Sequence, residues 1–188
     1  PRPVAGPWLT WSLLAQAAAW RAMWTANTDL LLRTLGLLAG FAWFARLGGQ
    51  QGETVLAANH LLLQLVAFSA FFLDGFAHVA EARVGQALGR GDRAGLRRDV
   101  RLGSELAVLS ALLLAAGIWL AGPLLLGVLS DLPAVVAQAV ACLPWAALYV
   151  VLSVPAFQLD GICIGAGMTA AMRRSVLQAL LLFVLLAW

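Results

Sequence analysis

The chain has 188 residues, of which 62% are hydrophobic and 11% are charged, and its mean hydropathy is +0.89. Soluble domains carry about 25% charged residues, so this composition excludes a water-soluble globular protein. Long continuous apolar runs, in place of alternating segments of about 10 residues, favour membrane-spanning helices over a transmembrane barrel. The predicted fold class is therefore an all-α integral membrane protein, a polytopic helix bundle in contact with membrane lipid.

Several other classes of function are excluded by the pattern of reactive and basic residues. All twelve basic residues are arginines, and the formal net charge is +3. No basic cluster is interleaved with exposed aromatic residues, so we expect no nucleic-acid partner. Cys142 and Cys163 lie in apolar segments, which indicates packing roles and predicts neither a disulfide framework nor a metal site. Because no P-loop, HExxH or Ser-His-Asp pattern is present, we expect neither an enzyme nor a cofactor.

The first expected element covers residues 8–27, which hold four tryptophans among polar residues. Such a segment is typical of a helix that lies in the membrane interface. An alternative is the end of a preceding transmembrane helix. We assign residues 1–29 to this interfacial linker. Residues 1–7 lack the pattern of a signal peptide, and we expect both ends of the chain to be truncated.

The first span is expected over residues 30–47. About 18 residues rising 1.5 Å each give about 27 Å, just enough for the hydrocarbon core. Asn27 or Asp29 can cap its start, because a short polar side chain accepts from free helical N–H groups. Gly36 and Gly40 form a small-xxx-small pair, which predicts close packing against another helix.

Further spans are expected over residues 54–80, 105–126 and 133–164, while residues 176–188 begin a fifth span that is too short alone. Residues 30–188 thus form one transmembrane unit. Pro144 and Pro155 should kink the fourth span, since each removes a backbone donor. If loops 82–101 and 165–175 are cytoplasmic, every arginine except Arg46 lies on the inner side, which is the positive-inside pattern. We expect a multi-pass protein of the bacterial inner membrane.

A polar stripe runs along the second span. Its members recur at spacings of three and four residues, which places them on one helix face: His60, Gln64, Ala67, Phe71, Asp74, His78 and Glu81. An acid inside a membrane helix costs about 2.5–3.5 kcal/mol, so Asp74 should face a cavity or a partner. As alternatives, Asp74 is a buried carboxylate that holds helices together, and Glu81 is an interfacial charge that pairs with a nearby arginine. His60 and His78 are expected at the rim or in packing.

The fourth span carries a second polar face, where Tyr149, Ser153, Ala156 and Asp160 recur at helical spacing. Backbone carbonyls freed by Pro155 can join Asp160 in a polar pocket, as in the cation sites of transporters. The segments FFLDGF (71–76) and FQLDGI (157–162) match at four of six positions, which suggests internal symmetry. A desolvated carboxylate can hold a proton and release it when a cation arrives, which is the chemistry of exchange.

Four segments, in order, resemble the multidrug and toxic compound extrusion (MATE) family, most closely its DinF-like branch. They are NTDLLLRTL (27–35), LAANHLL (56–62), LDGFAHVAEARVGQALGRGD (73–92) and QLDGICIGAGMTAAMR (158–173), and the resemblance spans residues 20–188. It implies two lobes of six helices, of which this chain holds the interlobe linker, helices 7–10 and the start of helix 11. It also implies a secondary antiporter that exports organic, cationic or amphipathic compounds in exchange for protons or sodium ions.

The resemblance also implies roles for particular residues. Asp160 resembles an acid of helix 10 that helps to bind the coupling cation, H⁺ or Na⁺, and Asp74 and Glu81 fall in a DGFA-x-x-x-E pattern. The helix-7 acid of other branches has no counterpart within residues 30–47, and the helix-1 aspartate of the first lobe lies outside the chain, which leaves the coupling ion open. The transport candidates are Asp160, Asp74, Glu81, Gln158 and Tyr149, with His78, Gln64 and Arg33 as secondary candidates.

Two other functions stay open at this point. A lipid-linked oligosaccharide flippase of the same superfamily would need a cavity lined with several arginines, whereas the arginines here lie nearly all in loops. The second open function is that of a truncated membrane subunit that does not transport. Under the main hypothesis the partners are a small organic substrate and the missing N-terminal lobe of the same protein, without which we do not expect the chain to transport.

Overall fold

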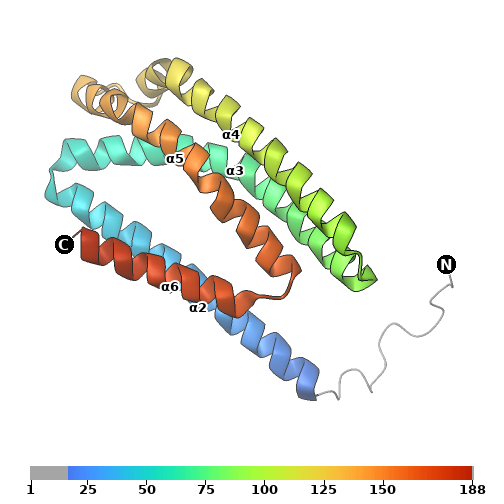
Figure 1. Cartoon of the computed structure of the whole chain (residues 1–188). Coiled ribbons are helices and arrows are strands. Elements are labelled where there is room, and N and C mark those ends of the chain that lie inside the picture. Colours follow the sequence, from blue (N-terminus) through green and yellow to red (C-terminus); the bar gives the residue numbers. More distant parts are fainter. Residues whose placement is uncertain (1–16, 188) are drawn as a thin grey trace, which may run out of the picture.

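The computed structural model describes residues 17–187, so the part of the expected linker before Ala17 lies outside the described residues. Within this range the helices are α2 (Ala17–Gln50), α3 (Glu53–Arg90), α4 (Arg93–Leu129), α5 (Pro133–Gly165) and α6 (Thr169–Leu186) (Figure 1). All five are long and apolar enough to cross a membrane. No strand occurs between residues 17 and 187, which confirms the all-α membrane fold.

The helices extend well beyond the predicted spans, and their connections are short. Residues 17–29, which we assigned to a separate linker, continue directly into α2, because no glycine or proline interrupts residues 17–35. The predicted loop 82–101 is mostly helical. Gly91 ends α3 in the left-handed conformation with φ 68°, and the Asp92 side chain caps α4 by accepting from the Gly95 N–H at 2.9 Å.

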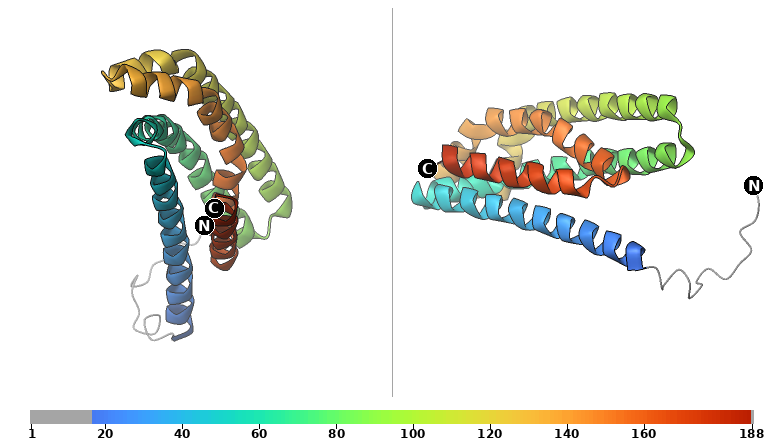
Figure 2. Two further views of the ribbon diagram at one scale, coloured as in Figure 1. Left: turned by 90° about the vertical axis from the view of Figure 1, so that its left-hand side faces the viewer. Right: turned by 60° about the horizontal axis from the view of Figure 1, so that its bottom comes forward.

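The helices form two groups. The helix trio consists of α3, α4 and α5, whose buried faces share one apolar core, and the helix pair consists of α2 and α6, which lie side by side (Figures 1 and 2). A Cβ added at Gly36 would lie 3.0 Å from Val176 Cγ1, and one at Gly40 would lie 3.8 Å from Leu180 Cδ1. The predicted close packing is therefore confirmed at Gly36, with α6 as the partner, whereas Gly40 makes an ordinary van der Waals contact with the same helix. Contacts between the pair and the trio are sparse.

Inside the trio, α5 approaches α3 at backbone distance. A Cβ built on Gly161 would collide with the carbonyl oxygen of Ala77, and one built on Gly165 would collide with that of Glu81. The Gly161-x-x-x-Gly165 spacing is the small-residue motif that lets membrane helices cross closely. Helix α5 continues through both of its internal prolines as one helix, and its ribbon bends along its length (Figure 2).

Candidate functional site

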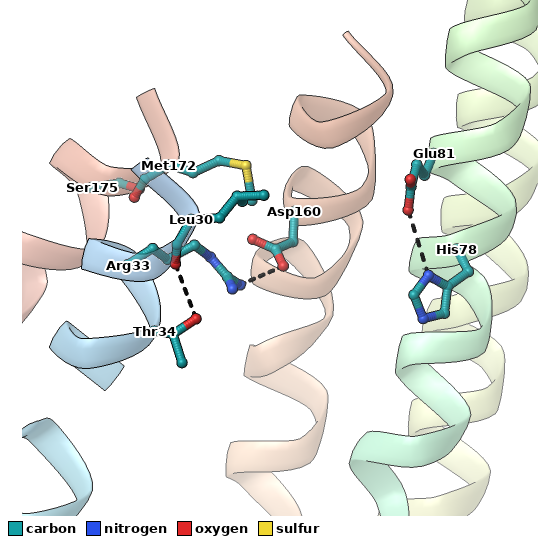
Figure 3. Close-up of polar contacts among 8 residues, drawn as sticks. All are labelled: Leu30, Arg33, Thr34, His78, Glu81, Asp160, Met172 and Ser175. Carbon is teal, nitrogen blue, oxygen red and sulfur yellow. Dashed lines mark hydrogen bonds and ion pairs between the residues drawn. The ribbon is translucent and has the colours of Figure 1, made fainter. Parts of the chain in front are cut away.

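An ion pair joins the helix pair to the helix trio. The Arg33 guanidinium on α2 donates through Nη2 to Oδ2 of Asp160 on α5 (Figure 3). The two side chains are 22% and 29% exposed, so both charges are largely removed from solvent. A lone charge within a membrane helix is costly, and each of these residues neutralises the other. The structure therefore brings together one main candidate, Asp160, and one secondary candidate, Arg33.

A second ion pair lies one helical turn away on α2. Asp29 is 2% exposed, and its Oδ1 accepts from Arg173 Nη1 at 2.5 Å while its Oδ2 accepts from Thr169 Oγ1 at 3.0 Å. Both partners belong to α6, so α2 binds α6 and α5 through successive turns. Asp29 lies inside α2, and its expected role as a helix cap is therefore wrong. The i, i+4 spacing of Asp29 and Arg33 in an apolar run was the sequence signal for an intramembrane charge cluster.

Asp74 on α3 is near this cluster. Its side chain is exposed within the described residues, so no helix between residues 17 and 187 buries it. Its charge acts on Asp160 across the contact between α3 and α5. The close approach at Gly161 explains this proximity, because Gly161 follows Asp160 directly and meets Ala77, one turn beyond Asp74. The LDG segment of α5 thus meets α3 at Ala77, directly after the matching segment 71–76.

The polar stripe of α3 points away from the core of the chain. Its members from His60 to His78 are all exposed, and Glu81 is half-buried, whereas the residues buried by α3 lie on the opposite face. Glu81 Oε2 lies 3.5 Å from His78 Nδ1, a histidine in place of the arginine that one alternative assigned to it (Figure 3). Gln64 Nε2 lies 3.5 Å from His60 Nε2. The stripe offers polar and charged groups to whatever covers this face.

Two other candidates lie apart from Asp160. Gln158 is 4% exposed and faces α4, where its Oε1 accepts from Ser104 Oγ at 3.5 Å. Helical residues two positions apart do not share a face, so Gln158 does not join the carboxylate. Tyr149 lies about 16 Å from Asp160 along α5 at 1.5 Å per residue. The sequence pattern places Tyr149 and Asp160 on the same face of α5. In the structure the two side chains lie at different depths along that helix.

Tyr149 lines an apolar cavity between the helix pair and the trio. The cavity has a volume of about 710 Å³ and takes residues from α2, α3, α5 and α6. Its lining includes the aromatic rings of Phe41, Phe44, Trp145, Tyr149 and Phe183. A smaller hollow of about 300 Å³ shares Phe41 and Tyr149 with it and extends along α5 to Phe157, next to the ion-pair region. Small-molecule sites have about 300–1,000 Å³ and mostly apolar walls, so this cavity is large enough for an organic compound.

Comparison with known proteins agrees with this architecture. The DNA damage-inducible protein F of Escherichia coli (strain K12) is 34% identical over 162 residues, which make up 84% of this chain and 35% of that protein. The probable multidrug resistance protein NorM of Rhizobium meliloti (strain 1021) is 42% identical over 78 residues, which make up 42% of this chain and 17% of that protein. The chain therefore spans well under half the length of these curated relatives. No solved structure matches the chain. The MatE family model matches residues 29–188, which include both ion pairs, the polar stripe and the cavity, and the chain belongs to the MatE family.

Proposed function

We propose that this chain is part of one lobe of a secondary antiporter in the bacterial inner membrane. The antiporter exports organic, cationic or amphipathic compounds in exchange for protons or sodium ions, and it needs a second lobe of the same protein. Family membership supports a transport function, and the name of the Rhizobium meliloti relative refers to multidrug resistance. The observation that carries the proposal is the Arg33–Asp160 ion pair between the two helix groups, with the apolar cavity nearby and the polar stripe of α3 exposed.

Two acids in one region of a membrane helix bundle supply the chemistry of exchange. A carboxylate there is stable only when a cation neutralises it, whether a proton, a metal cation or a basic group. An arriving cationic compound therefore competes with the coupling ion for the same negative charge. Each charge that crosses the membrane field also couples to it by about 2.3 kcal/mol per 100 mV. The apolar cavity offers space for the uncharged part of an amphipathic compound.

The proposal also implies how the helices are oriented across the membrane. The connections at residues 91–92 and 166–168 face the cytoplasm, because arginines gather at these ends of the helices. The two ion pairs then lie in the inner half of the membrane. The aromatic cavity lies in the outer half, since Phe41, Trp145 and Phe183 are on the outward parts of their helices.

The test is efflux of a fluorescent organic cation from cells that express the complete protein carrying this chain. Asp160→Asn and Asp74→Asn should each lower the efflux rate by at least about tenfold. That loss corresponds to an activation free energy about 1.4 kcal/mol higher. Asp131→Asn is the matched control, because Asp131 is an exposed acid in the connection before α5. Membrane levels of each variant are measured by immunoblot. Full efflux in both variants would show that neither Asp160 nor Asp74 is needed for transport.

A further inference from the structure

We propose that Arg33 is a tethered cation that occupies the carboxylate of Asp160 and excludes sodium ions from it. Arg33 would then be the residue that decides which coupling ion the transporter uses. This inference rests on the proposed antiport function and deepens it. The observation behind it is the direct contact from Arg33 Nη2 to Asp160 Oδ2, made between helices of different groups.

The geometry favours a proton over a sodium ion at Asp160. A hard metal cation is held by several oxygen atoms at once, including a carboxylate whose lone pairs are free. The guanidinium of Arg33 already takes Oδ2 and fills the place that a metal ion would occupy. Its charge opposes every added cation, so the discrimination comes from the number of free oxygen lone pairs that each cation needs. A proton needs only one lone pair, and the bond from Arg33 leaves Oδ1 for it. Asp160 can therefore be loaded with a proton while Arg33 stays near.

The surrounding charges keep Arg33 at Asp160. The other acid on this part of α2, Asp29, already accepts from both Arg173 and Thr169. Asp74 acts on Asp160 from α3, which adds negative charge near the guanidinium. Arginine does not lose its proton in proteins, so the tethered charge persists at every physiological pH. Arg33 is thus a permanent cation in a position that a free cation would otherwise fill.

Removal of the guanidinium charge should open the site to sodium. In Arg33→Gln no basic side chain contacts Asp160, because its ion-pair partner is gone. Both oxygens of Asp160 are then free to act as ligands of the kind that hard cations prefer. Arg33→Lys keeps a positive charge on a side chain of similar length, so it should continue to exclude sodium.

The experiment measures binding of radioactive ²²Na⁺ to the purified complete protein that carries this chain, in lipid nanodiscs. We expect no saturable binding in the wild-type protein or in Arg33→Lys, and saturable binding in Arg33→Gln at sodium concentrations at least about tenfold below the highest one tested on the wild-type protein. The double variant with Asp160→Asn should lose that binding again. Arg101→Gln is the matched control, since it removes an arginine from an exposed ion pair with Glu105. Saturable wild-type binding that Arg33→Gln does not strengthen would overturn the proposal, as would a folded Arg33→Gln chain that binds no sodium.

A second variant covers the case in which Arg33→Gln does not fold. Arg33→His can be purified near pH 5.5 with a charged imidazole and then measured near pH 8 with a neutral one. Sodium binding should appear only at the higher pH, and its absence from the folded variant at both pH values would overturn the proposal. These measurements need no transport, so they are separate from the proposed function. That function fails if the complete protein exports no organic cation, whatever the chain does with sodium.

Discussion

Replacement of Gly161 by alanine tests the backbone contact that brings the two acid-bearing segments together. The added Cβ would collide with the carbonyl oxygen of Ala77 and would lie 2.7 Å from its carbonyl carbon and 2.9 Å from its Cα. Carbon atoms in contact are about 3.5–4.0 Å apart, so α3 and α5 must separate by about 1 Å. A gap of that size forfeits about a quarter to a half of each dispersion contact along the crossing.

The expected loss of stability follows from this separation. Overpacking of a well-packed core typically costs about 1–3 kcal/mol, and we expect about 2–3 kcal/mol here because the obstacle is backbone and cannot rotate away. Gly75→Ala is the matched control. It also lies within α3, but nothing approaches its added Cβ within 4 Å. Alanine in place of a helical glycine should there add about 0.5–1 kcal/mol of stability.

The assay is unfolding of the purified chain in mixed micelles. The fraction of denaturing detergent is raised stepwise, and loss of helical circular dichroism reports unfolding. Gly161→Ala should unfold at a clearly lower detergent fraction than the wild-type chain, and Gly75→Ala at an equal or higher one. If Gly161→Ala unfolds together with the wild-type chain, the close crossing of α3 and α5 does not hold the trio together and the reasoning is refuted.

Two further predictions concern the helix pair and the orientation of the chain. Arg173→Gln should cost about 3 kcal/mol, because it leaves the buried Asp29 carboxylate without its ion-pair partner. The double variant with Asp29→Asn should lose at least about 1 kcal/mol less than the sum of the single losses in the same micelle assay, and additive losses would mean that the pair contributes no coupling. For orientation, single cysteines replace Gln51 or Arg90 in a chain freed of its own cysteines, and an impermeant thiol reagent is applied to intact cells. Residue 51 should react and residue 90 only after lysis; the reverse result would invert the proposed topology.

The sequence predicts the fold class well, because hydropathy and helical spacing are local properties. The apolar runs located all five described helices, and the three-and-four spacing located the exposed face of α3. Helix ends were less predictable. Residues 17–29 and the arginine-rich segment 82–101, apart from its turn at 91–92, are helical in the structure, since polar residues can continue a helix beyond the membrane. Asp29 was placed at a cap only because the start of α2 was expected near residue 30.

The pairing of charges depended on tertiary structure. Arg33 and Asp160 were both candidates, but nothing local indicates that residues 127 positions apart are partners. An arginine and an acid inside membrane helices do need counter-charges, so a pairing of this kind was a physical expectation. The crossing at Gly161 and Gly165 had a sequence signal, the small-xxx-small spacing, which the hydropathy pattern alone did not bring out.

The sparse boundary between the helix pair and the helix trio has a mechanical consequence. Each group buries its own packing face, while the boundary holds the Arg33–Asp160 ion pair and the apolar cavity. Sliding of one packed group past another is a common way for proteins to change shape with little loss of internal packing. The boundary is therefore where movement of the helix pair along the trio would break the fewest packing contacts. Such movement would strain the Arg33–Asp160 ion pair and change the width of the cavity together.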